Sequence, residues 1–122
     1  MRILGFSKKW QKLSNPEFTT FRFPRRDRDW EVGELVQVVY KPRSKNREIL
    51  GTAEIVGKEL RNMVKLLADE SPYPTISENE AKADGFKDYW EMWERLFDTY
   101  SGQRLIDEPM NKLTLRKCQS EH

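Results

Sequence analysis

The chain has 122 residues, of which 37% are hydrophobic and 34% charged, yet its formal net charge is only +2. This length suits one domain with its own core, and we expect a single domain over residues 1–122. The only cysteine, Cys118, excludes an intramolecular disulfide, and with the only histidine, His122, it argues against a Cys/His zinc site or a histidine-based triad. We therefore expect a cytoplasmic monomer without a metal or cofactor, because a lone cysteine suits a reducing compartment. No apolar run approaches the roughly 20 residues that span a bilayer, and Lys8 and Lys9 interrupt the apolar start, so we expect neither a membrane segment nor a signal peptide.

Charge is unevenly distributed along the chain. Segments 22–28 and 41–47 are strongly basic, whereas acidic residues outnumber basic ones over 78–99. The molecule is therefore bipolar, and the distribution says more about partners than the net charge does.

The N-terminal third predicts two strands around a short helix. Arg2–Phe6 is a short apolar strand, and Ser7 can cap a brief helix with inward-facing Trp10 and Leu13. Phe18–Phe23 is rich in aromatic and threonine residues, which favour a strand.

The middle of the chain predicts a hairpin. Leu35–Tyr40 places Val36, Val38 and Tyr40 on one face, and Ile49–Ile55 places Ile49, Ala53 and Ile55 on one face. The polar segment 42–46 connects the two strands, and Gly51 marks a bulge or a close approach.

The C-terminal half predicts helices followed by a strand. Residues 58–76 give no clear signal, except for a loop over 69–74. Ser77 with Glu80 forms a capping-box pattern that opens a helix, and Gly85 closes it. A second, aromatic helix runs over about 87–100, and the last strand covers 111–117. The order predicts a mainly β, α+β domain with a mostly antiparallel sheet that can close into a barrel.

One segment concentrates groups suited to chemistry. Glu17, Thr20 and Arg22 place a carboxylate, a hydroxyl and a guanidinium in one six-residue segment, which overlaps a predicted strand. Because side chains alternate along a strand, Thr20 and Arg22 lie on one face.

Three motifs in a fixed order carry a resemblance to a known family. They are Glu17-x-x-Thr20-x-Arg22, then Trp30-x-Val32-Gly33-Glu34 with Gly51-x-Ala53-x-Ile55, and finally Ala81-x-x-Asp84-Gly85-Phe86 before an aromatic helix. Together they resemble the ASCH domain, a branch of the PUA-like superfamily, over nearly the whole chain.

The resemblance implies a small PUA-like β-barrel with flanking helices and a cleft between the barrel and the helical insert. It also implies RNA binding, or an amidohydrolase activity on acetylated cytidine that uses a lysine, a threonine and a glutamate. Thr20 and Arg22 match the family motif, and Asp84 stands where the glutamate falls. Glu17 stands at the lysine position, so the expected cation is missing there. Lys12 is another lysine nearby, although the spacing does not require it to take part.

Each of the three matching residues also has a plain structural interpretation. Thr20 is a nucleophile or ligand contact, or an ordinary strand threonine. Arg22 binds a phosphate or base edge, or pairs with Glu17 or Asp84. Asp84 is a general base, or a carboxylate at a helix end.

Further candidates surround this segment. Trp30 can stack on a base or belong to the core, and Asn111 can point its carboxamide at a ligand or serve a turn. Basic side chains that can neutralise phosphates, or simply face solvent, are Arg25, Arg26, Arg28, Lys41, Arg43, Lys45 and Arg47.

Three functional hypotheses follow. The first is a module that binds RNA or a nucleotide-like small molecule near Thr20, Arg22 and Asp84. The second is an amidohydrolase in which Thr20 attacks a carbonyl, Asp84 or Glu17 accepts its proton and Arg22 stabilises the oxyanion. The third is a protein-interaction domain whose acidic helical insert docks a basic partner.

Overall fold

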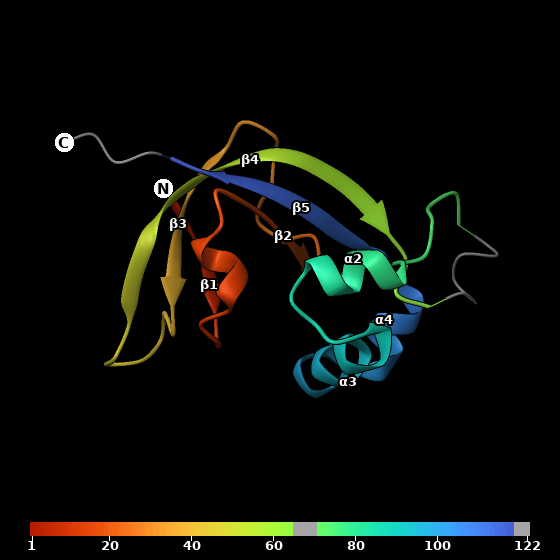
Figure 1. Ribbon diagram of the computed structural model, residues 1–122. Coiled ribbons are helices and arrows are strands. Elements are labelled where there is room, and N and C mark those ends of the chain that lie inside the picture. The colour runs from red at the N-terminus through yellow and green to blue at the C-terminus, as the bar shows by residue number, and fades with distance from the viewer. Residues whose placement is uncertain (65–70, 119–122) are drawn as a thin grey trace.

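The computed structural model describes residues 1–64 and 71–118, which form one mixed sheet with a group of helices at one end (Figure 1). In chain order the elements are β1 (Arg2–Phe6), the 3-10 helix η1 (Gln11–Ser14), β2 (Glu17–Arg22), β3 (Leu35–Tyr40), β4 (Glu48–Arg61), α2 (Glu78–Ala83), α3 (Tyr89–Thr99), α4 (Gly102–Asp107) and β5 (Met110–Lys117). The predicted α+β class is confirmed. No helix among the described residues is long and apolar enough to cross a membrane.

The sheet is mostly antiparallel, and it is open. Its strand order is β1-β3-β4-β5-β2, so the first two strands of the chain form its two edges. The β1–β3 pair is parallel, whereas the other three pairs are antiparallel. Backbone hydrogen bonds therefore do not close the sheet into a full barrel in the part of the chain that the structure describes.

Side chains connect the two edges where the backbone does not. Arg22 on β2 donates from Nη2 to the carbonyl oxygen of Gly5 on β1 at 2.7 Å. The rings of Phe6 and Phe18, one from each edge strand, pack edge to face with centroids 6.3 Å apart. The sheet is therefore curved enough to bring its edges together, as the long bent β4 also shows (Figure 1).

A bulge explains why one predicted core residue is outside. The β3–β4 register shifts between Val38 and Val39, which pair with Gly51 and Ile49 and leave Leu50 as the extra residue. Beyond the bulge the faces exchange, because side chains alternate with a period of two. Ile49 is therefore 57% exposed, and Leu50 packs on the core instead.

The helices follow local signals where these exist. Ser77 and Glu80 form the predicted capping box of α2, and Gly85 follows the helix with a positive φ of 112°. Ser7 does not cap η1, whose N-cap is Trp10 without a side-chain hydrogen bond. The sequence did not indicate α4, and the predicted loop at 69–74 lies partly outside the described residues.

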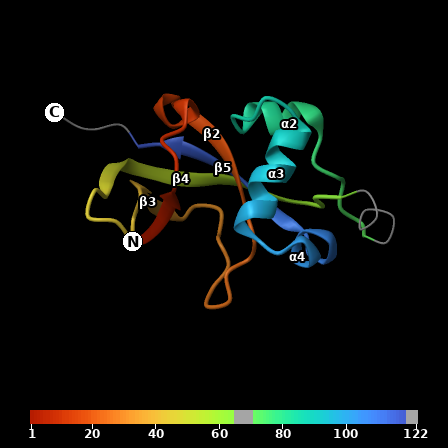
Figure 2. The same cartoon turned by 90° about the horizontal axis from the view of Figure 1, so that it is seen from below.

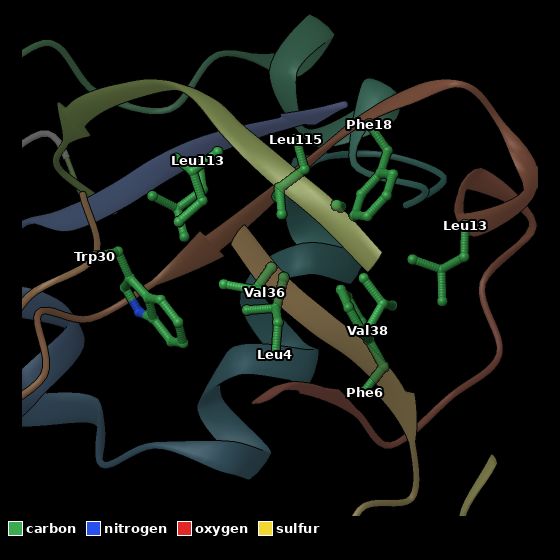
Figure 3. Packing of buried hydrophobic residues seen from close by; sticks show 11 residues of the cluster. Leu4, Phe6, Leu13, Phe18, Trp30, Val36, Val38, Leu113 and Leu115 are labelled. Carbon is green, nitrogen blue, oxygen red and sulfur yellow. The ribbon is translucent and has the colours of Figure 1, made fainter. Parts of the chain in front are cut away.

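Two apolar clusters lie side by side. The sheet cluster fills the concave face and is shown in Figure 3; its buried members are Leu4, Phe6, Leu13, Phe18, Trp30, Val36, Val38, Ala53, Ile55, Leu113 and Leu115. The helix cluster joins the far end of β2 and β5 to the helices, with Phe21, Phe23, Met63, Ile76, Ala81, Phe86, Met92, Leu105 and Met110 buried. Trp10 packs against both clusters, and α3 lies beside β2 (Figure 2). The candidate site lies at this junction.

Candidate functional site

A hollow of about 130 Å³, which we call the inner pocket, opens where η1, β2 and the helices meet. The side chains that matter to its chemistry are Trp10, Lys12, Thr20, Arg22, Asp84 and Tyr100. They come from three distant parts of the sequence. The structure thus brings Thr20, Arg22 and Asp84 together around one space and adds a lysine to them.

Lys12 and Asp84 form a buried ion pair in the wall of the inner pocket. The Lys12 Nζ donates to Oδ1 of Asp84 at 2.7 Å and to the carbonyl oxygen of Thr19 at 2.8 Å. Their side chains are only 6% and 7% exposed. Charged side chains this deeply buried are rare and need a partner, because the desolvation of each charge is unfavourable.

Burial shifts the pKa of both partners toward their neutral forms. It raises the pKa of the Asp84 carboxyl to about 6, against the opposing attraction of Lys12 and Arg22. It lowers the pKa of the Lys12 ammonium, and Asp84 counteracts that effect. A carboxyl that titrates near neutral pH can take up or release a proton in this pocket.

Arg22 links Thr20 to the pocket and to the edge of β1. Its Nε donates to Thr20 Oγ1 at 3.2 Å, while Nη2 donates to the carbonyl oxygen of Gly5. Thr20 is buried and Arg22 is half-buried. Burial lowers the pKa of the Arg22 guanidinium, but an arginine stays charged in proteins. Neither of the predicted ion pairs of Arg22, with Glu17 or with Asp84, occurs among the described residues.

Aromatic rings form the apolar side of the inner pocket. Trp10 packs edge to face on Phe86 with ring centroids 5.0 Å apart, and Tyr100 lies at the end of α3. A Cβ atom at Gly85 would stand 3.0 Å from Cε3 of Trp10, so the backbone after α2 passes close to that ring. The tight packing fixes the position of Trp10 beside Asp84.

A second, larger hollow of about 830 Å³ adjoins the inner pocket, and we call it the outer groove. It shares Gly5, Phe6, Ser7, Arg22 and Thr99 with the inner pocket. The rest of its wall is Ile3 and the turn after β3, namely Lys41, Pro42, Arg43 and Ser44. Two of the predicted basic residues, Lys41 and Arg43, therefore lie next to the site.

Three predicted site residues lie elsewhere. Glu17 is exposed at the start of β2, where Oε2 faces Nε of Arg116 at 3.6 Å. Trp30 belongs to the sheet cluster, and the Arg2 guanidinium lies over its ring, with Cζ of Arg2 4.5 Å from the centroid of the Trp30 ring. Asn111 is fully buried and donates to Asp29 from Nδ2 at 2.8 Å. None of the three lines the inner pocket, and the structure shows them instead in an ion pair, in core packing and in a buried hydrogen bond.

The remaining basic candidates are dispersed. Arg25 pairs with Asp27 at 3.1 Å, and Arg28 faces Glu34 at 3.6 Å. Arg26 lines a separate hollow, while Lys45 and Arg47 are exposed in the turn that leads into β4. They do not form one basic track with the inner pocket.

Lys12 is the functional candidate that the sequence did not assign. The resemblance placed a lysine at position 17, five residues later and on the strand. Lys12 stands on η1, directly before the buried Leu13, and no local pattern marks it. Only the folding of η1 over the end of α2 brings it to Asp84.

The inner pocket combines donors, an acceptor and a hydroxyl in one small space. The described ranges contain no group of three metal-ligating side chains. Exposed acidic residues of α3 include Glu91, Glu94 and Asp98, and their docking to a basic partner stays a prediction.

No protein-family model, curated protein or solved structure matches the chain. The geometry of the inner pocket is therefore the basis for inferring a function.

Proposed function

We propose that the chain is a PUA-like domain of the ASCH type that binds an RNA-derived nucleotide, with the base in the inner pocket. The observation that carries the proposal is the convergence of Thr20, Arg22 and Asp84 with Lys12 on one hollow. The bridged edges of the curved sheet support the barrel-like part of the proposal, since they bring β1 and β2 to the same side of the site.

The chemistry of the pocket suits a planar, polar heterocycle. Lys12 and Arg22 are donors, Asp84 is an acceptor whose pKa near 6 also lets it donate when protonated, and the Thr20 hydroxyl can do both. Base edges present donors and acceptors side by side, and unpaired bases are read by such contacts together with aromatic rings. The small volume suits one base rather than several.

Calorimetric titration with the four ribonucleosides and their 5′-monophosphates tests this proposal. We expect at least one ligand to bind, and Asp84→Asn to weaken its binding at least tenfold, because the amide cannot carry the charge that pairs with Lys12. Glu17→Gln is the matched control, since it makes the same change on an exposed strand residue and should leave affinity unchanged. A folded wild-type protein that binds none of these ligands at millimolar concentration would contradict the proposal.

A second candidate is an amidohydrolase that removes the acyl group from an acylated nucleoside. Lys12 favours it, because the structure supplies a buried cation that position 17 lacks. In this candidate the Thr20 hydroxyl attacks the acyl carbonyl, and its proton passes to the Asp84 carboxylate. The released amine takes up a proton, and water then hydrolyses the acyl ester on Thr20. Arg22, already hydrogen-bonded to Thr20 Oγ1, stabilises the developing negative charge.

Incubation with N4-acetylcytidine and chromatographic detection of cytidine tests the second candidate. We expect turnover that disappears in Thr20→Val, which keeps the shape of the side chain but removes the hydroxyl. Thr20→Ser should retain part of the activity. Binding without turnover in the wild-type protein would leave nucleotide binding alone as the function.

A further inference from the structure

The outer groove has the composition of an anion site. Three of its ten lining residues are cationic, namely Arg22, Lys41 and Arg43, and none is acidic. Neither Lys41 nor Arg43 takes part in an ion pair within residues 1–64 and 71–118. A concave surface that is lined by positive charges and has no neutralising carboxylate attracts an anion.

The backbone holds the cationic turn against the site. Lys41 has a φ of 47°, the left-handed conformation that non-glycine residues rarely adopt, and it is the only such residue among those described. Its N–H donates to the carbonyl oxygen of Phe6 at 2.8 Å, and its own carbonyl accepts from Ser44 N–H at 3.0 Å. Strained backbone of this kind persists where the surrounding structure imposes it, often at ligand sites. Here it ties the turn to β1, which forms a wall of both hollows.

Arg22 spans the two hollows. It belongs to the lining of the inner pocket and of the outer groove, and its guanidinium lies between Thr20 and Gly5. The cations of the outer groove therefore adjoin the inner pocket at Arg22. The two hollows form one composite site.

The other basic residues argue for a short ligand over a long polymer. The separate hollow beside Arg25 and Arg26 also contains Asp107 and Glu108, and Arg28 already faces Glu34. Acidic residues therefore interrupt the basic surface around Arg25, Arg26 and Arg28. A single phosphate satisfies the cations that the site offers.

We propose that the outer groove binds the phosphate of a nucleoside monophosphate whose base lies in the inner pocket, with Lys41, Arg43 and Arg22 as its partners. This inference rests on the proposed nucleotide binding and adds the class of ligand. Arginine and lysine suit this role because both form charge-assisted hydrogen bonds to phosphate oxygens.

The test compares each ribonucleoside with its 5′-monophosphate by calorimetry on two double variants. Lys41→Asn with Arg43→Gln removes both cations, and asparagine tolerates the left-handed backbone at position 41. Lys45→Gln with Arg47→Gln removes the same charge from the same loop outside the composite site. Circular dichroism and thermal unfolding confirm that both variants remain folded.

We expect the wild-type protein to prefer the monophosphate at least tenfold over the nucleoside. The first double variant should lose that preference and keep its affinity for the nucleoside, while the second should behave as the wild type. Equal wild-type affinity for the two ligands would overturn the phosphate site but not base binding. If neither ligand binds, the proposed function itself fails. If an oligoribonucleotide of ten nucleotides binds more than tenfold tighter than the monophosphate, the ligand is a longer RNA and not a single nucleotide.

Discussion

The Lys12–Asp84 pair is the least ordinary contact between two residues in this molecule. Both side chains are almost fully buried, and the Nζ–Oδ1 distance is 2.7 Å. A well-packed apolar pair often stabilises a protein more than a buried ion pair does. Stability alone therefore gives little reason for Lys12 and Asp84 to occupy these positions.

A double-mutant cycle measures how strongly the two groups depend on each other. We expect Lys12→Met and Asp84→Ala each to lower the free energy of unfolding by about 3 kcal/mol, because each leaves the other buried charged group without its partner. The double variant should lose at least about 1 kcal/mol less than the sum of the two. Urea unfolding gives the three values, and strict additivity would show that the two groups are independent.

The raised pKa of Asp84 makes stability depend on pH. The folded pKa of about 6 exceeds the ordinary value of 3.8, so the folded state holds this proton more tightly than the unfolded chain does. This contribution to stability is fully present below pH 3.8 and is lost as the pH rises through 6. It amounts to about 3 kcal/mol over that interval.

The measurement is the difference in unfolding free energy between the wild type and Asp84→Asn at pH 4, 5, 6 and 7. We expect the wild type to lose stability relative to the variant as the pH rises across this range. A constant difference would contradict the raised pKa.

At the residue scale, the sequence predicted part of the site through family resemblance. Thr20, Arg22 and Asp84 lie together in the structure. Glu17 does not join them, because the strand alternation that places Thr20 inside leaves Glu17 at an exposed start of β2. Lys12 could not be assigned, since its approach to Asp84 depends on a tertiary contact 72 positions apart.

Among the elements, the chain reversal after α2 has the closest connection to the site. Asp84 is the C-cap of that helix, and Gly85 turns the backbone with φ of 112° against the ring of Trp10. One short segment thus sets the position of the carboxylate and of an aromatic wall.

Gly85→Ala should disturb both stability and binding. The left-handed backbone costs an alanine about 1 kcal/mol, and its Cβ would also press on Trp10 at 3.0 Å. Gly33→Ala is the matched control, because Gly33 also has a positive φ but no atom within 4 Å of the added Cβ. We expect thermal unfolding to show a larger loss for Gly85→Ala, with nucleotide affinity reduced only in that variant; equal losses would show that the contact with Trp10 is unimportant.

Elements with strong local signals were predictable, and those that depend on packing were not. The capping box of α2 and the buried Val36 and Val38 of β3 match the structure, because both signals are encoded within a few neighbouring residues. The extension of β4 to Arg61 was missed, since pairing with β5 supports it there without a regular apolar pattern. α4 was also missed: it starts at Gly102, a weak helix former, and its Arg104 packs over the ring of Phe23.

At the scale of the whole molecule, the site depends on an open sheet whose edges meet through side chains. Arg22 is the main polar bridge between β2 and β1, and it also belongs to both hollows. The shape of the molecule and the chemistry of its site therefore share one residue.

Arg22→Lys tests this shared role. A lysine keeps the charge but lacks the planar fork that reaches Thr20 Oγ1 and the Gly5 carbonyl together. We expect the free energy of unfolding to fall by about 2 kcal/mol, because a hydrogen bond to a charged group is lost from a partly buried position. Arg116→Lys, on the exposed pair with Glu17, should cost less than about 0.5 kcal/mol in the same urea titration. Similar losses in the two variants would show that the bridge contributes little.

The strand order also decides when the site can exist during synthesis. β2 has its sheet neighbour in β5, nearly a hundred positions later, so the edge that carries Thr20 and Arg22 stays unpaired until the C-terminal strand has left the ribosome. Such distant pairing slows folding, because a long loop must close before its contacts form. The proposed ligand binding would therefore require the completed fold, and a nascent chain that stops before Met110 should lack the inner pocket.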